Sequence, residues 1–336
     1  MRMIYFDLGE ANHSRLLIIF HHLIFDGISW RIFLEDFQDV YHQLSISEQV
    51  RLSPKTSSVQ TWSRALVAYA QSPQVQEEVD YWLSMAEQDP PHLPVDFDTE
   101  QNTYGSTEYV TLGLDPAETE ALLHALPAAQ GTQVNDVLLT GLVNAMSPWT
   151  GRRALWVEME GHGRENIGVS VDVSRTIGWF TASFPVLLDL SAIGSVSEQL
   201  QAIKSQLRGI PNHGIGFGLL RYLTKDEGVR RRMKSIFRPQ ISFNYLGQFD
   251  QLPRDDWFPF QIAAESAGLE QDPQGMRSTL LDVVGIVTGG EMQFRWIYSR
   301  NVHARSTIER VAHQYLEELR ATVLTAVDVL RQQQET

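Results

Sequence analysis

The sequence predicts a fold that mixes helices and strands (α/β or α+β), and three observations support this. Some short stretches alternate apolar and polar side chains as β-strands do, for example residues 107–114. Others carry apolar residues at helical spacing, for example from Trp30 to Leu44. The two patterns also interleave along the whole chain, which argues against an all-helical or an all-strand fold.

The expected elements follow one another without an internal repeat. Residues 4–8 and 15–20 predict a hairpin, and a helix follows from Trp30 with Ser29 as its expected N-cap. Helical patterns at 59–86, interrupted at Pro73, precede a stiff linker from Asp89 to Pro94. The remaining expected elements are strands at 107–114, 155–160, 184–190, 240–246, 279–287 and 292–299, and helices from Asp115 and at 135–146, 196–208, 216–223 and 306–332.

Length and composition limit the possible functions. The chain has 336 residues, enough for about two domains of roughly 150 residues each, and we place the boundary after the linker, giving 1–104, which carries H-H-x-x-x-D-G, and 105–336. A net charge of −14 argues against nucleic-acid binding. The absence of cysteine excludes disulfides and cysteine-based zinc sites. The sequence lacks a membrane-spanning apolar run and a signal-peptide pattern, so we expect a cytoplasmic protein that does not contact a membrane.

The first candidate site, F-H-H-L-I-F-D-G at residues 20–27, lies where the second strand meets the helix. A histidine there can act as a general base. Neighbouring side chains of a strand point to opposite faces, so only one of His21 and His22 should face a cleft if the strand continues. Asp26 can hold the turn by pairing with an arginine, and Gly27 permits unusual backbone angles. The ordinary alternative is a core histidine, and a metal site is a further alternative.

A second cluster, E-M-E-G-H-G-R-E at residues 158–165, also follows a strand pattern. Strand period two places Glu158 and Glu160 on one face, so the spacing does not choose between them. The two glycines around His162 make an open turn that a ligand can approach. The ordinary alternative is a charged loop. Further clusters are R-T-I-G-W-F-T from Arg175, the weak phosphate-loop candidate G-I-G-F-G from Gly214, and F-N-Y-L-G-Q from Phe243.

Six stretches are weak signals individually but informative when they occur together in one order: H-H-L-I-F-D-G-I-S-W, N-D-V-L-L, E-G-H-G-R-E, R-T-I-G-W-F-T-A-S-F-P, P-N-H-G-I-G-F-G and F-N-Y-L-G-Q. Together they closely resemble the epimerization domains of non-ribosomal peptide synthetases, a branch of the condensation-domain superfamily. The resemblance covers essentially the whole chain. H-H-x-x-x-D-G alone is shared with condensation and chloramphenicol-acetyltransferase-like enzymes, whereas E-G-H-G-R-E and F-N-Y-L-G-Q indicate the epimerization branch.

The resemblance implies a two-lobed, chloramphenicol-acetyltransferase-like fold with a tunnel between the lobes. A partner carrier domain would insert its phosphopantetheine arm, which bears an aminoacyl or peptidyl thioester, into this tunnel. The implied isomerase converts the L α-carbon to an L/D mixture and so provides D-amino acids for secondary metabolism. The implied partners are a peptidyl or acyl carrier domain and other synthetase modules, and we expect no cofactor and no metal on the chain itself.

The resemblance also assigns residues. Inversion of a stereocentre requires a base on one face of the carbanion and an acid on the other. By resemblance, His22 is the active histidine and Glu160 is its carboxylate partner. For Glu160 to donate a proton, burial should raise its pKa. Asp26 has a supporting role, and we expect it to pair with Arg164 or Arg175. His21, Gly27 and His162 are expected to be structural. Asn244 and Tyr245 are candidates for lining the site.

The sequence also departs from the family pattern, because the family's segment before the H-H motif, with its P-I-Q-x-W-F-type start, is not found. We therefore expect an incomplete (truncated) first lobe with an exposed apolar sheet face. Three interpretations remain: a catalytic epimerase, a non-catalytic remnant or carrier-binding piece, and, less well supported by the motifs, a peptide-bond-forming condensation domain. The basic run from Arg230 to Lys234 predicts either a solvated helix face or a docking site for an acidic carrier domain.

Overall fold

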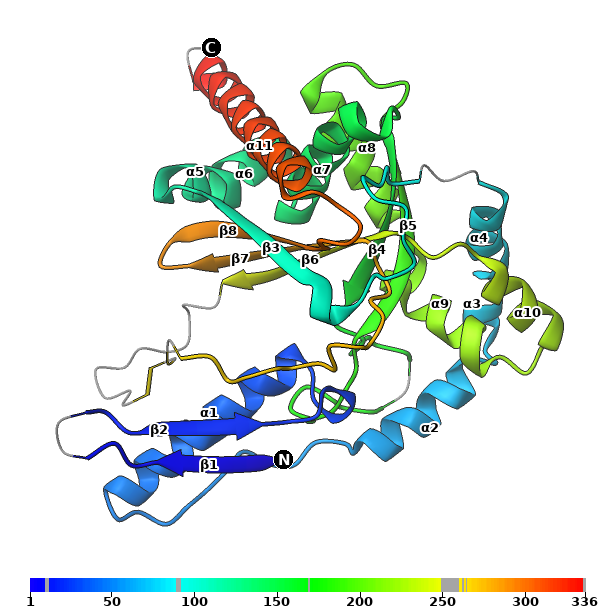
Figure 1. The fold of residues 1–336 in the computed structure, drawn as a ribbon. Helices are drawn as coiled ribbons and strands as arrows, with labels where there is room; N and C mark the ends of the chain where they lie inside the picture. The colour runs from blue at the N-terminus through cyan, green and yellow to red at the C-terminus, as the bar shows by residue number, and fades with distance from the viewer. Residues whose placement is uncertain are drawn as a thin grey trace.

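Figure 1 shows the fold of the chain in a computed structural model. The structure describes residues 1–9, 12–88, 92–168, 170–248, 260–261, 263 and 265–334. The predicted linker falls partly outside this set, because residues 89–91 are not described. Of its remaining residues, Leu93 is buried, and its backbone N–H donates to Gln240 Oε1 at 2.8 Å.

A mixed six-stranded sheet is the largest element of the described chain, with strand order β3-β8-β7-β6-β4-β5. β6 runs parallel to both of its neighbours, β7 and β4, and the other pairs are antiparallel. The strands are β3 (Thr107–Leu114), β4 (Ala154–Gly161), β5 (Ala182–Asp189), β6 (Ile241–Gln248), β7 (Leu281–Thr288) and β8 (Glu291–Ser299). All six match strands expected from the alternation of apolar and polar residues, which confirms the predicted mixed fold.

Helices cover one face of this sheet (Figure 1): α5 (Pro116–Glu120), α6 (Leu126–Gln130), α7 (Val134–Thr150), α8 (Val196–Arg208) and α11 (Arg305–Gln334). α7 and α11 approach closely at Gly141, where a Cβ atom would lie 2.8 Å from Leu319. From α11, Tyr315 packs edge-on against Phe294 and Trp296 of β8. The expected cap of α5 is also present, since Asp115 and Glu118 form a capping box ahead of Pro116.

The N-terminal region is built differently. β1 (Arg2–Phe6) and β2 (Arg15–Ile19) form a two-stranded antiparallel sheet, as expected, and α1 (Gly27–Ser45) follows it. Large apolar side chains on both faces of the hairpin are exposed; they are Met3, Ile4, Tyr5, Phe6, Leu16 and Ile19.

A third group of helices lies beside β5 (Figure 1): α2 (Val59–Tyr69), α3 (Pro73–Gln76), α4 (Val79–Ser84), α9 (Ile215–Gly218) and α10 (Glu227–Ser235). A π-helical turn, Leu219–Leu223, follows α9. Gln71, just after α2, donates to the Leu223 carbonyl at 2.9 Å, so segments from both sides of the predicted 104/105 boundary pack together here. No helix in the described residues is long and apolar enough to cross a membrane.

Candidate active site

The two adjacent histidines lie after β2, not within it. β2 ends at Ile19, and His22–Ile24 form a 3-10 turn, so the expectation that strand alternation separates the histidines is wrong. The turn separates them instead. His21 caps the turn, because its Nδ1 accepts a hydrogen bond from the Leu23 N–H at 3.1 Å. The exposed His22 ring packs against Trp179, with 4.4 Å between the ring centroids.

Asp26, rather than Ser29, is the N-cap of α1, so the predicted cap is wrong. The helix begins at Gly27, and Asp26 Oδ1 accepts from the Ser29 N–H at 2.7 Å. Both residue types cap helices well, and apolar periodicity alone placed the start three residues too late. Ser29 is buried and bonds across the molecule instead: its hydroxyl donates to the Gly178 carbonyl and accepts from the Gly178 N–H, both at 3.0 Å.

Arg164 is the partner of Asp26. Its Nη2 lies 3.2 and 3.3 Å from the two Asp26 carboxylate oxygens, and both side chains are almost completely buried. Its Nη1 donates to the carbonyls of Val173 and Thr176, and its guanidinium lies 3.9 Å from the centre of the Phe180 ring. This cluster therefore ties the start of α1 to the loop that follows β4.

Arg175, the other expected partner of Asp26, pairs instead with Glu35 and Asp36 of α1. These three side chains are about one-third exposed. Arg164 and Arg175 thus both connect α1 to the 164–180 segment, one through a buried contact and the other through a partly solvated one.

Glu160 lies at the end of β4, and Glu158 shares its face, as the spacing predicted. The Asn244 side chain on β6 donates to Glu160 Oε2 at 2.9 Å. Burial raises the pKa of Glu160, the neighbouring Glu158 carboxylate raises it further, and the positive charge of His22 lowers it. Glu160 keeps contact with solvent, but the surrounding protein removes enough water to favour its neutral form. The direction of this shift agrees with the expectation from the sequence.

Glu158 is also shifted. Burial raises its pKa, and Arg238 and Arg221 oppose this effect. The strand therefore carries two carboxyl groups with raised pKa values on one face. Two contacts distinguish Glu160 from Glu158. Asn244 donates a hydrogen bond to Glu160, and the charge of His22 lowers the pKa of Glu160.

Tyr245 does not join this group. It follows Asn244 on β6 and points to the opposite face, where it packs against the core and burial raises its pKa. There it lies beside Gly285, where a Cβ would come 3.4 Å from the tyrosine ring. Its expected role in lining the site is therefore not supported by its position.

The E-G-H-G-R-E turn is held by local contacts. His162 Nδ1 accepts from the Arg164 N–H at 2.9 Å, which supports a structural role for this histidine. Gly163 has a φ of +63°, and a Cβ there would lie 1.6 Å from the Phe180 carbonyl oxygen. Only glycine fits this position, and the close approach places Trp179 and Phe180 beside the end of β4.

A cavity of about 560 Å³ adjoins the end of β4. Glu158 and Trp179 line it, and so does Ser183, the register partner of Glu160 on β5. Much of the remaining lining is apolar, from α2 and from Phe217 of α9, with Arg221 and Arg238 also on the wall. Trp179, which touches both His22 and this cavity, was not selected from the sequence, although its R-T-I-G-W-F-T motif was.

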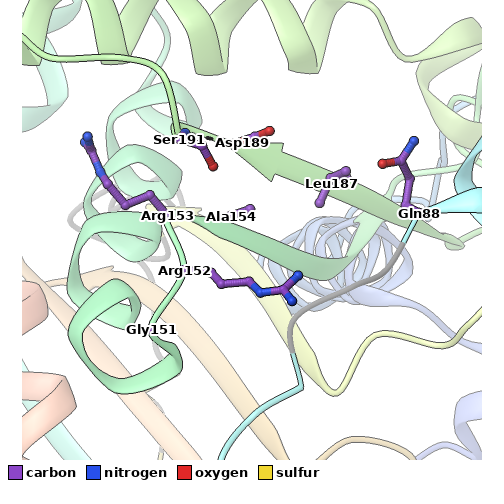
Figure 2. Close-up of a pocket in the computed structure, with 8 residues that line it drawn as sticks. All are labelled: Gln88, Gly151, Arg152, Arg153, Ala154, Leu187, Asp189 and Ser191. Carbon is purple, nitrogen blue, oxygen red and sulfur yellow. Dashed lines mark hydrogen bonds between the residues drawn. The ribbon is translucent and has the colours of Figure 1, made fainter.

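A second cavity, of about 430 Å³, lies at the opposite end of β4 (Figure 2). Arg153, one of its lining residues, already donates to the Ile193 carbonyl at 2.7 Å. None of the predicted site residues lines this cavity, so it is separate from the candidate site. Within the described residues, no cluster of acidic or histidine side chains could hold a metal ion.

Comparison with known proteins assigns the chain to a family. The family model of the condensation domain matches residues 1–334. The chain belongs to the condensation domain family. It is 45% identical over 320 residues to a linear gramicidin synthase of Brevibacillus parabrevis, and 35% identical over 323 residues to bacitracin synthase 2 of Bacillus licheniformis. These matches cover 95% and 96% of this chain but only 4% and 12% of those relatives.

A solved structure adds finer information. The epimerization domain from the third module of tyrocidine synthetase B superposes with a TM-score of 0.87 at 35% identity, covering 94% of this chain and 70% of that one. The first condensation domain of the calcium-dependent antibiotic synthetase superposes with a TM-score of 0.66 at 19% identity, which shows a shared fold. The chain is thus a condensation-type domain of the kind found in non-ribosomal peptide synthetases.

Proposed function

We propose that this domain inverts the α-carbon of an aminoacyl or peptidyl thioester carried on the phosphopantetheine arm of a partner carrier domain. The observation that carries the proposal is the position of Glu160. Its pKa is raised by burial, Asn244 holds its carboxylate, and His22 from a distant part of the chain acts on it electrostatically. The 35% identity to an epimerization domain supports the choice of this reaction over peptide-bond formation.

The proposed chemistry uses the two groups in turn. Neutral His22 removes the proton from Cα of the L residue, and the electron pair of the broken C–H bond delocalises into the thioester as an enolate. Protonated Glu160 then donates its proton to the opposite face of Cα, which gives the D residue. After one turnover His22 holds a proton and Glu160 has lost one, and exchange with solvent restores both groups. A raised pKa supports this role because it increases the protonated fraction of Glu160.

We assign the 560 Å³ cavity to the arriving thioester arm. It adjoins Glu158 and Trp179, and its volume falls within the range usual for ligand pockets. The exposed basic residues of α10 lie near the same wall, because Phe237 and Arg238 follow this helix directly and line the cavity. We therefore favour α10 as the surface that meets an acidic carrier domain. Reversing the charges of Arg231 and Arg232 should weaken carrier binding while leaving the cavity unchanged.

The direct test is to incubate the domain with an L-aminoacyl carrier protein in deuterated water. The proposal predicts deuterium at Cα together with an L/D mixture of the released residue. Peptide-bond formation with an acceptor carrier, without Cα exchange, would instead identify a condensation enzyme. If neither product forms while the carrier still binds, the chain is a carrier-binding piece without catalytic activity.

A matched pair of variants tests the choice of carboxylate. Glu160→Gln should abolish inversion, because glutamine cannot transfer the proton. Glu158→Gln removes a carboxyl group from the same face of the same strand and should lower the activity only partly, because Glu158 lines the cavity and its charge helps to raise the pKa of Glu160. The opposite result, an active Glu160→Gln and an inactive Glu158→Gln, would assign the second catalytic group to Glu158.

A further inference from the structure

Glu78 is a buried carboxylate at the start of α4 that the proposed reaction does not use. Glu78 is 4% exposed, and none of the ion pairs found among the described residues includes it. Two neutral donors hold it instead: Trp82 Nε1 bonds to Oε2 at 2.8 Å, and Asn212 Nδ2 bonds to Oε1 at 2.6 Å. Burying a carboxylate without a cation costs free energy, which these two hydrogen bonds offset in part.

The Asn212 bond reaches an unusual turn. Asn212 and His213 have φ values of +43° and +53°, and Gly214 follows with +85°. Non-glycine residues rarely adopt this conformation, and two in succession persist only where the surroundings hold them. The same carboxylate also packs directly against the next turn, since a Cβ on Gly216 would lie 1.8 Å from Glu78 Oε2.

The 212–214 turn contacts the end of β4, which carries Glu160, and the start of β5. A Cβ on Gly161, the residue after Glu160, would lie 3.2 Å from the His213 carbonyl oxygen. A Cβ on Gly214 would lie 2.1 Å from the Phe184 ring, so that ring packs flush against the turn.

The Trp82 bond leads to the same ring. Trp82 is fully buried and lies edge-on to Phe184, with 6.3 Å between the ring centroids. Phe184 follows Ser183, the register partner of Glu160. Both hydrogen bonds of Glu78 therefore converge on the end of the β4–β5 pair.

We propose that Glu78 is a positioning residue that sets the place of Glu160 through the 212–214 turn and Phe184. The proposal rests on the proposed function for its catalytic consequence. Glu78 itself does not touch the reacting atoms. Its loss should lower kcat more than it raises KM, because displacing a catalytic group by about 1 Å can reduce the rate by about a hundredfold.

An exchange of donor and acceptor tests this link. Asn212→Asp places two carboxylates in contact and should lower kcat for Cα exchange by about tenfold to a hundredfold. Adding Glu78→Gln restores both bonds, because the glutamine oxygen accepts from Trp82 and its amide donates to the aspartate introduced opposite it. The double variant should recover kcat to within about threefold of the parent, a coupling that a double-mutant cycle measures. Glu77→Ala, at the exposed neighbouring residue, is the matched control for Glu78→Ala and should change nothing.

Amide hydrogen exchange of residues 159–164 provides a readout that does not depend on catalysis. It should be faster in Asn212→Asp and return to the parental rate in the double variant. A parent domain without Cα exchange would refute the proposed function, while the amide readout would still test the structural link. The positioning role is overturned if Glu78→Ala folds and keeps the parental kcat, or if the double variant recovers neither kcat nor amide protection.

Discussion

The N-terminal hairpin and the six-stranded sheet each deliver one half of the candidate site, but they hold their side chains in place by different means. Glu160 extends from β4, a strand of the sheet that also buries Val283, Phe294 and Trp296 completely. His22 follows a two-stranded sheet whose Tyr5 is 66% exposed. The buried sheet therefore fixes the strand that carries Glu160, whereas His22 depends on a few specific contacts to the other region.

Those contacts are the Asp26–Arg164 pair, the Ser29–Gly178 hydrogen bonds and the Trp179 ring. All three reach the 164–180 segment, which directly follows the strand of Glu160. The relative position of the two proposed catalytic groups, His22 and Glu160, therefore depends on this one segment. Variants that remove one of these contacts at a time test how much each contact contributes to stability and to activity.

The largest effect is expected from Arg164→Ala. Removing one partner of a buried ion pair leaves Asp26 as an uncompensated charge, which typically costs about 3–5 kcal/mol. The free energy of unfolding, measured by urea denaturation, should fall by this amount, and inversion should be lost. Arg164→Lys keeps the charge but not the forked geometry and should recover only part of the loss. If Arg164→Ala lowers the free energy of unfolding by less than about 1 kcal/mol, the Asp26–Arg164 pair does not hold the two regions together.

Trp179→Ala should have the next largest effect. The indole packs on the His22 ring, and aromatic contacts contribute about 0.5–1.5 kcal/mol beyond the area that they bury. We expect kcat for Cα exchange to fall about threefold to tenfold, with carrier binding little changed. Trp179→Phe retains an aromatic face and should be close to the parent. Equal losses in both variants would mean that the ring contact does not orient His22.

Asn244→Ala tests the sheet side of the comparison. The amide stabilises the charged form of Glu160, so its loss should raise the pKa of that carboxyl group further. Glu160 donates only when protonated, so its ionisation should contribute one limb of the pH–rate profile. That limb should move to higher pH in Asn244→Ala, because the pKa of Glu160 rises. A limb that stays in place would argue against Glu160 as the proton donor.

Arg175→Ala should have the smallest effect. This arginine also connects α1 to the 164–180 segment, but its pairs with Glu35 and Asp36 are partly solvated and should contribute about 0–1 kcal/mol. Urea denaturation should show little change at physiological ionic strength. A loss as large as that of Arg164→Ala would mean that burial does not explain the difference between the two arginines.

Sequence reasoning located most of the fold because the apolar periodicities are strong. It gave the bounds of α8 correctly and those of β2 to within one residue. It failed at the junction between hairpin and helix, since a 3-10 turn of three residues has no periodicity to detect. The assignment of Tyr245 to the site lining was avoidable from the sequence. Neighbouring strand residues face opposite sides, and Asn244 was already assigned to the site.

Other features of the site cannot be read from one sequence. Both Arg164 and Arg175 lie far from Asp26 along the chain, and only the packing of the loop after β4 decides which of them reaches it. The same holds for the bond from Asn244 to Glu160 and for the contact between Glu78 and the 212–214 turn. These are contacts between distant segments, and each depends on the final arrangement of the sheet.

The central claim is that His22 and Glu160 act on opposite faces of one α-carbon. Its most direct test uses the variants His22→Ala and Glu160→Gln in deuterated water. The uptake of deuterium at Cα is measured in two separate reactions, one with an L-aminoacyl carrier protein and one with a D-aminoacyl carrier protein. Both variants should lose inversion, yet each should retain exchange on the one enantiomer whose proton its surviving base can reach, and the two retained enantiomers should differ. If Glu160→Gln still inverts the α-carbon, or if both variants retain exchange on the same enantiomer, the two-base account is contradicted.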